Sequence, residues 1–428
     1  MKNALLLPML LCACSTSMAF DYSLQPVISS SERYTSNLYM TSLPHQDNWI
    51  TKVSPGVNFN LRNEDAQLST NFTWNQLFYT NQSALDINEQ LFNLDYSHRK
   101  DRWQWGLDGS FNNQSSLSSE ASNQGTIQGY TLKQVMAKQL NIAPSLTYAL
   151  SELSSATINY SYAQAAYEKN NNSYLSDYDY QQISGTYNYL YTIKDKLNLT
   201  LSGSQYHKPM STHSNFQSLN YSLATNNDQA SVGWQHSFPQ QWVSYLSVGM
   251  NYSQSELNEI IPAHIIPGHF AIINNAWKYI SPKVVAQSDF NKNTTGTGQI
   301  YQASLQKSFE QAAISLVGSQ NQTPTTQGLQ TQTQLSINPS YTINERWNTG
   351  LSASYAIYKM PTHIGGYSLD RDYTSISPNV NWRWTPEVNV GLSYTYREQI
   401  YKNNTNSAQD NGLLLQLTYQ PQTNNQVK

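Results

Sequence analysis

The chain has 428 residues, a formal net charge of -3 and a mean hydropathy of -0.57. Only 12% of its residues are charged, against roughly 25% in ordinary globular proteins, so the usual charged surface is missing. The 31 tyrosines and 10 tryptophans exclude a disordered chain, and the small net charge gives no reason to expect a nucleic-acid partner.

The first twenty residues, MKNALLLPMLLCACSTSMAF, have the pattern of a secretory signal. An apolar stretch follows one lysine, and a small-x-small site ends at Ala19, so we expect residues 1–19 to be removed and the mature chain to begin at Phe20. The alternative interpretation is a lipobox that would acylate Cys14. Since Cys12 and Cys14 both lie in this segment, the cleaved chain has no cysteine for a disulfide.

Alternation with a period of two dominates the rest of the chain. It is seen in ATINYSYA (156–163), LNLTLSG (197–203), WNTGLSASYAIY (347–358) and EVNVGLSYTYRE (387–398). Such alternation predicts strands with one apolar and one polar face, and their length suits a tilted crossing of a membrane. After residue 20 no apolar run approaches the roughly 18 residues of a membrane helix, so a closed barrel is the remaining way to span lipid.

Two kinds of connection alternate between these stretches. The short ones are charged, at 62–66, 98–103, 193–197, 309–313, 344–347 and 385–388. The longer ones are rich in Asn, Ser, Thr or Gly, at 115–129, 168–177, 291–299 and 359–372. Outer-membrane barrels combine short periplasmic turns with longer external loops. We therefore predict one all-β domain over residues 20–428, a transmembrane antiparallel up-and-down barrel of about 20 strands within a range of roughly 16 to 20.

Tryptophans gather beside the short connections and predict an aromatic girdle at that interface: Trp103, Trp105, Trp242, Trp347, Trp382 and Trp384. A weak internal repeat places a proline just before several short turns, in VSPGVNF (53–59), IAPSLTY (142–148), INPSYTI (337–343) and ISPNVNW (376–382). Because proline removes a ladder donor, we expect each to mark a bulge or a strand entry. A soluble β-solenoid is the structural alternative, but it would need one uniform coil length, whereas these connections alternate in length.

The sequence contains no motif for catalysis. It has no G-x-S-x-G elbow, no H-E-x-x-H, no Walker loop and no cysteine pair, so we expect no enzyme activity, no cofactor and no metal. His264 and His269 lie in the apolar stretch IIPAHIIPGHF (260–270) without Asp or Cys nearby, which is weak support for a metal site. We expect this stretch to be an external loop that folds inward or packs on a partner.

Charged residues inside strands are informative, because Arg or Lys on the lipid face costs about 2–4 kcal/mol at mid-membrane. We expect the following to face the lumen or to lie near an interface: Lys52, Lys133, Lys138, Asp289, Lys307, Arg383 and Arg397. A charged lumen that selects solutes is one interpretation, and snorkelling at the interface is the other, at least as good for the last two residues. The many uncharged polar residues at inward positions would suit sugars.

The chain closes on DNGLLLQLTY (410–419), in which Gly412, Leu415, Leu417 and Tyr419 resemble the C-terminal signal by which barrels are recognised for insertion. A polar tail, QPQTNNQVK, follows, where many barrels end on the aromatic residue itself. We expect alternate residues from Leu413 to Tyr419 to face lipid, and this strand to close the barrel against the first one.

The segments SSERYTSNLYM (30–40) and ITKVSPGVNFNLR (50–62) resemble the start of the beta-barrel porin-2 type of outer-membrane protein. This group includes barrels associated with exopolysaccharide and PEP-CTERM/exosortase systems. The matching positions are Ser31, Glu32, Arg33, Tyr34, Asn37 and Val53-Ser54-Pro55-Gly56-Val57, and they cover only the beginning of the mature chain. The resemblance implies a barrel linked to export or surface assembly of polysaccharide, transfers no catalytic residues, and suggests Glu32 and Arg33 as a lumen pair or a plug contact.

These observations together predict a Gram-negative, cell outer-membrane, porin-like barrel that acts as a pore or secretion component for exopolysaccharide. Its expected partners are outer-membrane lipid, the barrel-assembly machinery, polysaccharide and export components. Two alternatives remain open: a structural or adhesive surface barrel with a plugged lumen, and an outer-membrane hydrolase.

Overall fold

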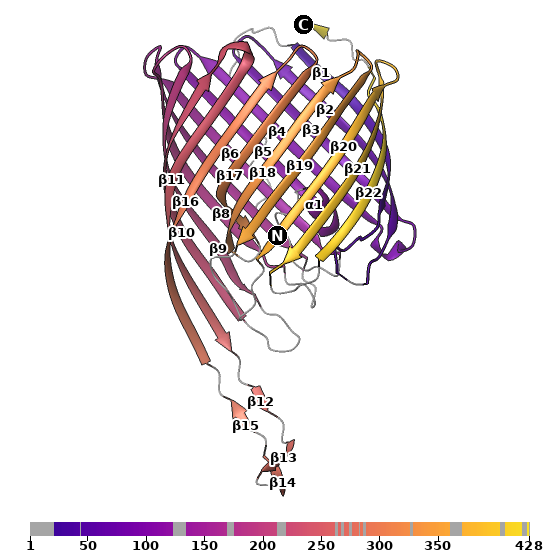
Figure 1. Cartoon of the computed structure of the whole chain (residues 1–428), viewed down its shortest axis with the longest axis vertical. Coiled ribbons are helices and arrows are strands. Elements are labelled where there is room, and N and C mark those ends of the chain that lie inside the picture. Colours follow the sequence, from indigo (N-terminus) through magenta and orange to yellow (C-terminus); the bar gives the residue numbers. More distant parts are fainter. Residues whose placement is uncertain are drawn as a thin grey trace.

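The strands of this computed structural model form one closed antiparallel barrel (Figure 1). The structure describes residues 21–42, 44–122, 134–168, 175–211, 220–261, 264–266, 269–273, 276–281, 283–285, 288–325, 328–359, 370–402, 407–421 and 426–427. Within these residues the barrel wall has 18 strands, so the all-β closed barrel is confirmed and the expected number of about 20 is wrong, although 18 lies within the expected range.

Each wall strand pairs antiparallel with the next along the chain. The first nine are β1 (Asp21–Thr35), β2 (Asn48–Arg62), β3 (Ala66–Tyr79), β4 (Ile87–Lys100), β5 (Trp103–Ser115), β6 (Met136–Ala149), β7 (Ser154–Tyr167), β8 (Tyr178–Leu190) and β9 (Asp195–Ser211). The others are β10 (Asn220–Ser237), β11 (Trp242–Ile261), β16 (Ser288–Ser308), β17 (Ala312–Thr325), β18 (Gly328–Thr342), β19 (Trp347–Lys359), β20 (Arg371–Arg383), β21 (Val388–Tyr401) and β22 (Ser407–Tyr419). Finally β22 pairs with β1, which closes the barrel.

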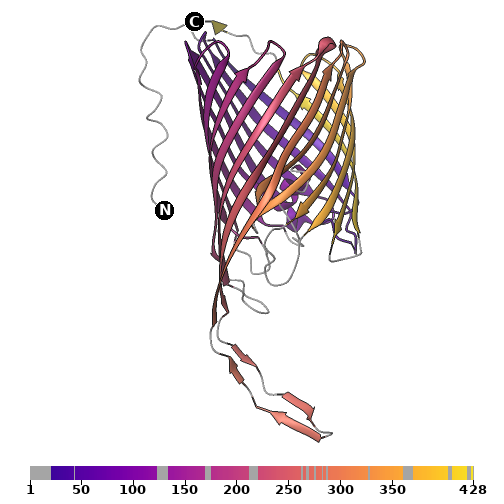
Figure 2. The same ribbon diagram turned by 60° about the vertical axis from the view of Figure 1, so that its left-hand side comes forward.

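Four short strands lie outside the wall and form an arm. β12 (His264–Ile266) pairs with β15 (Lys283–Val285), and β13 (His269–Ile273) pairs with β14 (Ala276–Ile280). Figures 1 and 2 show the arm continuing from β11 and β16 past one end of the barrel. The short helical elements are η1 (Ser83–Leu85), α1 (Ser116–Ser122) and η2 (Pro239–Gln241). Among the described helices, none has the length and apolar character needed to cross a bilayer.

Residues 291–299 are strand, not the loop that their Asn, Thr and Gly content predicts. They belong to β16 and pair along their length with β11. The ladder supplied by a neighbouring strand overrides weak local propensity, which is a known limit of strand propensity. The long connections that remain join strands at one end, here called the loop end, and the short connections join them at the other, the short-turn end.

The short turns are closed by polar side chains that accept hydrogen bonds from the backbone. The Asn63 Oδ1 accepts from the Asp65 N–H (3.0 Å), and the Asn344 Oδ1 accepts from the N–H groups of Arg346 (2.9 Å) and Trp347 (3.0 Å). Asn, Thr and Ser favour such local bonds, so they reverse the chain within a few residues. The charged short segments of the sequence are therefore tight turns, as expected.

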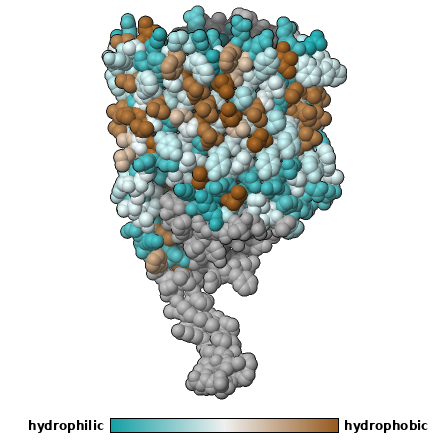
Figure 3. Space-filling view, viewed as in Figure 1, coloured by the Kyte–Doolittle hydropathy of each residue, from teal (hydrophilic) through white to brown (hydrophobic). Residues whose placement is uncertain are grey.

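Apolar side chains alternate onto the outside of the barrel and form a belt. Leu413, Leu415, Leu417 and Tyr419 are 43%, 52%, 46% and 42% exposed, and they alternate with inward-facing residues of β22. Figure 3 shows hydrophobic side chains gathered around the middle of the barrel, with more hydrophilic rims above and below them. A belt of this kind is what strands crossing a bilayer present to lipid.

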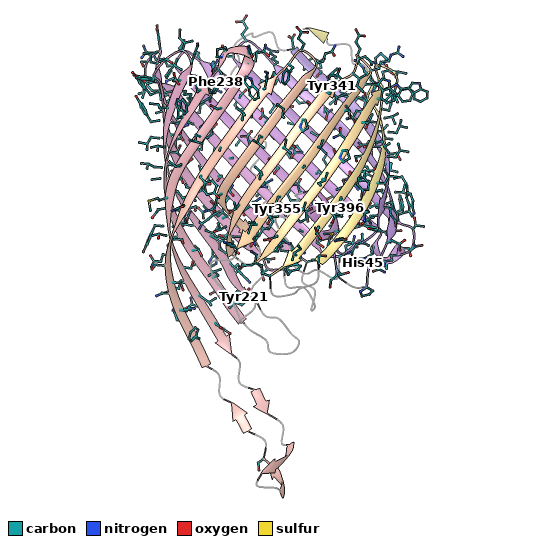
Figure 4. The ribbon with its side chains drawn as sticks, viewed as in Figure 1. His45, Tyr221, Phe238, Tyr341, Tyr355 and Tyr396 are labelled. Atoms are coloured by element: carbon teal, nitrogen blue, oxygen red, sulfur yellow. The ribbon has the colours of Figure 1, made fainter. Side chains whose placement is uncertain are left out.

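Aromatic residues border the belt at two levels. At the short-turn end the rings of Trp347 and Trp382 stack with centroids 5.5 Å apart. Figure 4 shows Phe238 and Tyr341 at this same end, with Tyr355 and Tyr396 closer to the loop end. The tryptophans beside the short turns thus lie where a girdle is expected.

The repeated prolines occupy regular positions within strands, so the expected bulge or strand entry is wrong. Pro144 of β6 keeps its pairing with Leu107 of β5. On the other edge the ladder to β7 skips from Ile142 to Ser145 without a change of register. Gaps of the same kind contain Pro55, Pro339 and Pro378, each with the residue before it. The missing N–H costs a local break in one ladder, and the neighbouring pairs hold the register.

The last wall strand pairs with the first, as predicted from the closing run of the sequence. The ladder runs from Gly412 opposite Thr35 to Tyr419 opposite Ile28. Beyond it, β23 (Gln426–Val427) of the polar tail pairs with the first two residues of β1. These two residues belong to the part of β1 that projects past β22.

Candidate functional site: the barrel lumen

Many uncharged polar side chains line the inner wall in the short-turn half of the barrel, together with Asp95 and Asp108, which face each other on β4 and β5. Register places them opposite one another on neighbouring strands, where they form hydrogen bonds across the ladder. Examples are Asn71 to Asn58 (2.6 Å), Ser69 to Asn60 (2.8 Å), Thr147 with Thr157 (2.9 Å), Thr186 with Thr200 (3.0 Å) and Ser377 with Thr395 (2.8 Å). Hydroxyl and amide groups can donate and accept, so this surface can exchange its bonds with water or with sugar hydroxyls.

Charged residues concentrate on the inner wall nearer the loop end, in a group here called the charge cluster: Arg33, Lys52, Glu89, Arg397 and Asp410. Arg33 interacts electrostatically with Arg397, Asp410 and Glu89, and Lys52 with Glu89 and Arg33. Three cations therefore share two carboxylates. These residues come from β1, β2, β4, β21 and β22, which become neighbours because the barrel closes.

Asp410 is the most heavily bonded member of the charge cluster. It is 1% exposed, and its Oδ2 accepts from the Arg397 guanidinium at 2.6 and 3.1 Å. Its Oδ1 accepts from the Thr35 hydroxyl (2.7 Å) and from the Asn37 N–H (3.0 Å). One carboxylate therefore ties β21 and β22 to the end of β1 and to the loop that follows it, across the seam where the barrel closes.

Glu89 plays a similar part on the neighbouring stretch of wall. It is 2% exposed, its Oε1 accepts from the Ser115 N–H (3.0 Å), and its Oε2 accepts from the Asn75 amide (3.2 Å). The first of these bonds fixes the point where β5 ends and α1 begins, so Glu89 positions α1 at the mouth.

Apolar side chains also enter the lumen at the loop end and narrow it. The Leu117 cluster joins residues from α1, from the loop after β1, and from the inner faces of β2 and β3: Leu38, Ile50, Leu77, Tyr79 and Leu117. The Tyr206 cluster lines the opposite stretch of wall: Val135, Ala137, Ala165, Tyr167, Leu175, Tyr178, Tyr206, Leu223, Leu257 and Leu329. The wall residues of both clusters face inward, because they alternate with outward-facing positions of the same strands. The residues that join them from α1 and the loops, such as Leu38, Leu117 and Leu175, therefore lie in the barrel mouth.

Two further cations lie on the inner wall beside tyrosines. Arg371 is 3% exposed, donates to the Gln399 amide oxygen (3.0 Å) and lies 5.0 Å from the centre of the Tyr358 ring. Lys208 is fully buried, with its ammonium 3.6 Å from the centre of the Tyr221 ring. Cation–π contacts of this kind hold a positive charge away from bulk water.

The charges predicted from the sequence lie on different surfaces. Lys52 and Arg397 face the lumen in the charge cluster, and Arg383 ends β20 on the inner face at the short-turn end. Lys307 lies on the outer face at that end, where its ammonium is 4.6 Å from the Trp242 ring centre and 4.4 Å from that of Phe309.

The remaining predicted charges lie apart from the cluster. Lys138 is exposed on the outer face, opposite Asn113 near the loop end. Asp289 is paired with Ile260 where β16 continues beyond the rim, and its side chain lies outside the described residues. Lys133 and the predicted signal segment also lie outside them.

Glu32 and Arg33 do not form the pair suggested by the family resemblance. They are consecutive residues of a strand, so they occupy opposite faces. Glu32 faces outward and accepts from the Thr51 hydroxyl (2.6 Å), whereas Arg33 interacts with Glu89 and Asp410 inside.

Sequence reasoning missed Glu89, Arg371 and Lys208. Alternation would have placed Glu89 inward, because Phe92 and Leu94 of the same strand face outward. Its closeness to β1 and β22 could not be read from the sequence. In the part of the chain that the structure describes, no group of three or more His, Cys, Asp or Glu side chains could hold a metal ion. The side chains of His264 and His269 lie outside that part.

Neither a family model nor a curated protein sequence matches the chain. Solved structures with a similar course include the open form of the ferric-catecholate import receptor Fiu from E. coli K12, at 9% identity and TM-score 0.46, covering 92% of this chain and 81% of that one. Others are OccK2 (OpdF) from Pseudomonas aeruginosa in complex with glucuronate, at 7% identity and TM-score 0.43 (94% and 99%), and OccAB2 from Acinetobacter baumannii, at 9% and 0.43 (94% and 98%). At these TM-scores the likenesses carry no argument about what this chain does.

Proposed function

We propose that this protein is an outer-membrane β-barrel that acts as a channel for uncharged hydrophilic solutes, with its short-turn end in the periplasm. The observation that carries the proposal is the difference between the two faces of the same strands. The outer face is an apolar belt, whereas the inner face is a hydrogen-bonding wall with few charges. Strands that cross a bilayer can pair all their backbone N–H and C=O groups only in a closed barrel. A polar lumen then offers a hydrated path through the membrane.

The lumen would select solutes in two ways. In the short-turn half, hydroxyl and amide side chains can replace the water around a sugar hydroxyl without a charged partner. Nearer the loop end, the two apolar clusters set the width, and the charge cluster places a net positive potential beside the passage. Neutral solutes of small cross-section would pass most readily.

Reconstitution tests the channel directly. The purified protein should show heat-modifiable migration on a gel, steady single-channel conductance in planar bilayers, and swelling of proteoliposomes in isotonic solutions of small neutral sugars. Swelling rates should fall as the size of the sugar increases, and a change in sugar size should lower them more than the addition of a charge to the sugar. A folded, heat-modifiable barrel without conductance or swelling would overturn the channel.

The finer proposal is that the cargo is an exopolysaccharide. It is supported by the resemblance of residues 30–62 and by the uncharged polar pairs on the inner wall of the short-turn half, and it receives no support from the comparisons. Deletion of the gene should remove polysaccharide from the cell surface while polymer accumulates in the periplasm. Unchanged surface polysaccharide in the deletion strain would reject this cargo and leave the channel intact.

The partners follow from the same proposal: outer-membrane lipid around the belt, and the assembly machinery that would recognise Gly412, Leu415, Leu417 and Tyr419. Export would depend on removal of residues 1–19, or on acylation of Cys14. The mass of the mature protein distinguishes these two. Removal of Tyr419 should lower the amount of assembled barrel in the outer membrane.

A second candidate is a surface barrel with a plugged lumen, which interacts through its loops. The packing of α1 and the loop after β1 into the Leu117 cluster, and the arm beyond the rim, favour it. Bilayer conductance separates the two candidates, because a plugged barrel would be silent.

A further inference from the structure

β16 and β17 pair over only part of their length. The ladder runs from the Ser308–Ala313 pair at the short-turn end to the Tyr301–Gln320 pair, and stops there. Both strands continue, but each stays paired on its other edge only, β16 with β11 and β17 with β18. The barrel wall therefore forks after Tyr301 and Gln320.

Beyond the fork, the described end of the β17–β18 hairpin, residues 321–325 and 328–332, here called the tip, turns into the lumen. The Tyr206 hydroxyl, on the inner face of β9, donates to the Thr325 carbonyl (2.7 Å). Leu329, on the other side of the tip, is 4% exposed in the Tyr206 cluster with Leu223 and Leu257. The tip thus lies against the inner faces of β9, β10 and β11, the strands that precede β16 in the wall, held by a hydrogen bond and by apolar contact.

Among the described residues, the inward turn leaves one edge of β16 without a partner strand beyond Tyr301. Its residues 296–300, GTGQI, contain no lysine, proline or bulge of the kind that protects exposed edges. At the fork the Gln320 side-chain amide donates to the Gln299 carbonyl (2.7 Å), so a side chain takes up an acceptor on this edge. An open edge in a membrane protein is costly, because lipid cannot satisfy its backbone groups.

We propose that the β17–β18 tip is a gate that exchanges between two positions, here called seats. The first is its place in the lumen, and the second is the open edge of β16 in the barrel wall. In the lumen seat, seen here, the tip narrows the mouth and leaves the wall open at the fork. In the wall seat, residues 321–325 extend the existing register onto residues 296–300, and the tip leaves the lumen. The consequence for solute flow rests on the proposed channel function, whereas the exchange of pairing does not.

The two seats offer comparable interactions. The wall seat adds backbone pairs, but Pro324 has no N–H to donate to them. The lumen seat keeps the Tyr206–Thr325 bond and the burial of Leu329. The interactions of one seat do not greatly exceed those of the other in free energy. A small free-energy difference is the condition for exchange between two conformations.

Disulfide trapping tests the wall seat. Continued register places Gln299 opposite Gln322, so the Q299C/Q322C variant should cross-link on mild oxidation in the assembled barrel. L305C/L316C, a pair within the existing ladder, reports the rate for strands already paired. T295C/Q322C, out of register on the same face, reports chance collision. Folding of every variant is checked by heat-modifiable migration.

The lumen seat is tested by loosening it. Y206F removes the hydroxyl that bonds Thr325, so Q299C/Q322C should cross-link about fivefold faster in that background, the factor that one hydrogen bond is worth. Y178F removes a hydroxyl from the same cluster, where Tyr178 stacks on Tyr206 at 5.6 Å, and should leave the rate unchanged. Cross-linking of Q299C/Q322C no faster than T295C/Q322C, while L305C/L316C reacts, would overturn the proposal.

Conductance then separates the gate from the channel. Oxidised Q299C/Q322C should conduct more than the reduced protein, and reduction should restore the lower level. Cross-linking without a change in an otherwise measurable conductance would reject the gating role. Efficient cross-linking in a barrel that never conducts would instead reject the proposed channel and leave the two seats standing.

Discussion

The two ends of the barrel are built from the same strands but differ in what holds them. At the short-turn end, turns are tight, the ladders keep their register across the breaks at the prolines, and the inner wall carries uncharged polar pairs. At the loop end, buried charges bridge the seam, loops pack into the lumen, and β16 and β17 separate. The short-turn end depends on local chain reversal and regular pairing, whereas the loop end depends on contacts between distant segments. A change at the loop end should therefore affect stability and permeation together.

The largest effect is expected at the seam, from D410N. It removes the charge of the carboxylate that accepts two hydrogen bonds from the Arg397 guanidinium, which interacts with Arg33, and loss of one member of a buried pair costs about 3–5 kcal/mol. The measurement is the free energy of unfolding in urea, in lipid vesicles.

The matched control is D372N, which breaks the more exposed ion pair between Asp372 and Lys402 (3.6 Å) and should cost about 0–1 kcal/mol. The double variant R397Q/D410N should recover part of the loss. Equal effects of D410N and D372N would show that the seam is not held more strongly than the rim.

The outer belt is tested by L415R, with Q416R on the opposite face of the same strand. Arginine at position 415 would meet lipid and cost about 2–4 kcal/mol, whereas arginine at the neighbouring position would face the lumen and cost much less. Both are measured as the heat-modifiable fraction and as unfolding free energy in vesicles. A larger loss for Q416R would reverse the assignment of the two faces.

The aromatic girdle is tested by W347L. It removes the ring that stacks on Trp382 at an interplanar angle of 11°, and such a contact contributes about 0.5–1.5 kcal/mol beyond area burial. W105L changes another exposed indole at the same end, outside this stack, and should cost less. The free energy of unfolding in vesicles is measured for both variants. Identical values would show that the Trp347–Trp382 stack does not contribute to stability.

The smallest effect is expected on ion preference, from K52E. Reversing one charge in the charge cluster should shift the permeability ratio of cation to anion by about fivefold, the factor that an interaction of roughly 1 kcal/mol between water-exposed charges produces. Reversal potentials in a salt gradient measure it, with K138E, on the outer face, as the control. An unchanged ratio would place the conducting path away from the charge cluster.

Some of these features were predictable because they depend on neighbours in the sequence. Alternation assigns Leu415 and Leu417 outward and Gln416 inward, and the structure agrees. The tight turns follow from short polar segments. The predicted number of strands was wrong where local composition conflicts with strand pairing. Residues 291–299 have the composition of a loop, but they pair with β11 as part of a strand.

Other features could not be predicted, because they depend on which distant strands meet. Asp410 and Thr35 are at opposite ends of the chain, yet the closure of the barrel brings them to 2.7 Å. The regular place of Pro144 in its strand also required the structure, because the neighbouring pairs that hold its register belong to other strands.

The all-β barrel architecture, its apolar and polar faces and the alternation of short and long connections follow from local patterns in the sequence, since a period of two and the turn residues act over a few positions. The number of strands, the charge cluster, the packing of loops into the mouth and the fork between β16 and β17 are visible only in the folded chain. These depend on barrel closure and on register between segments far apart in the chain, and no local pattern encodes either.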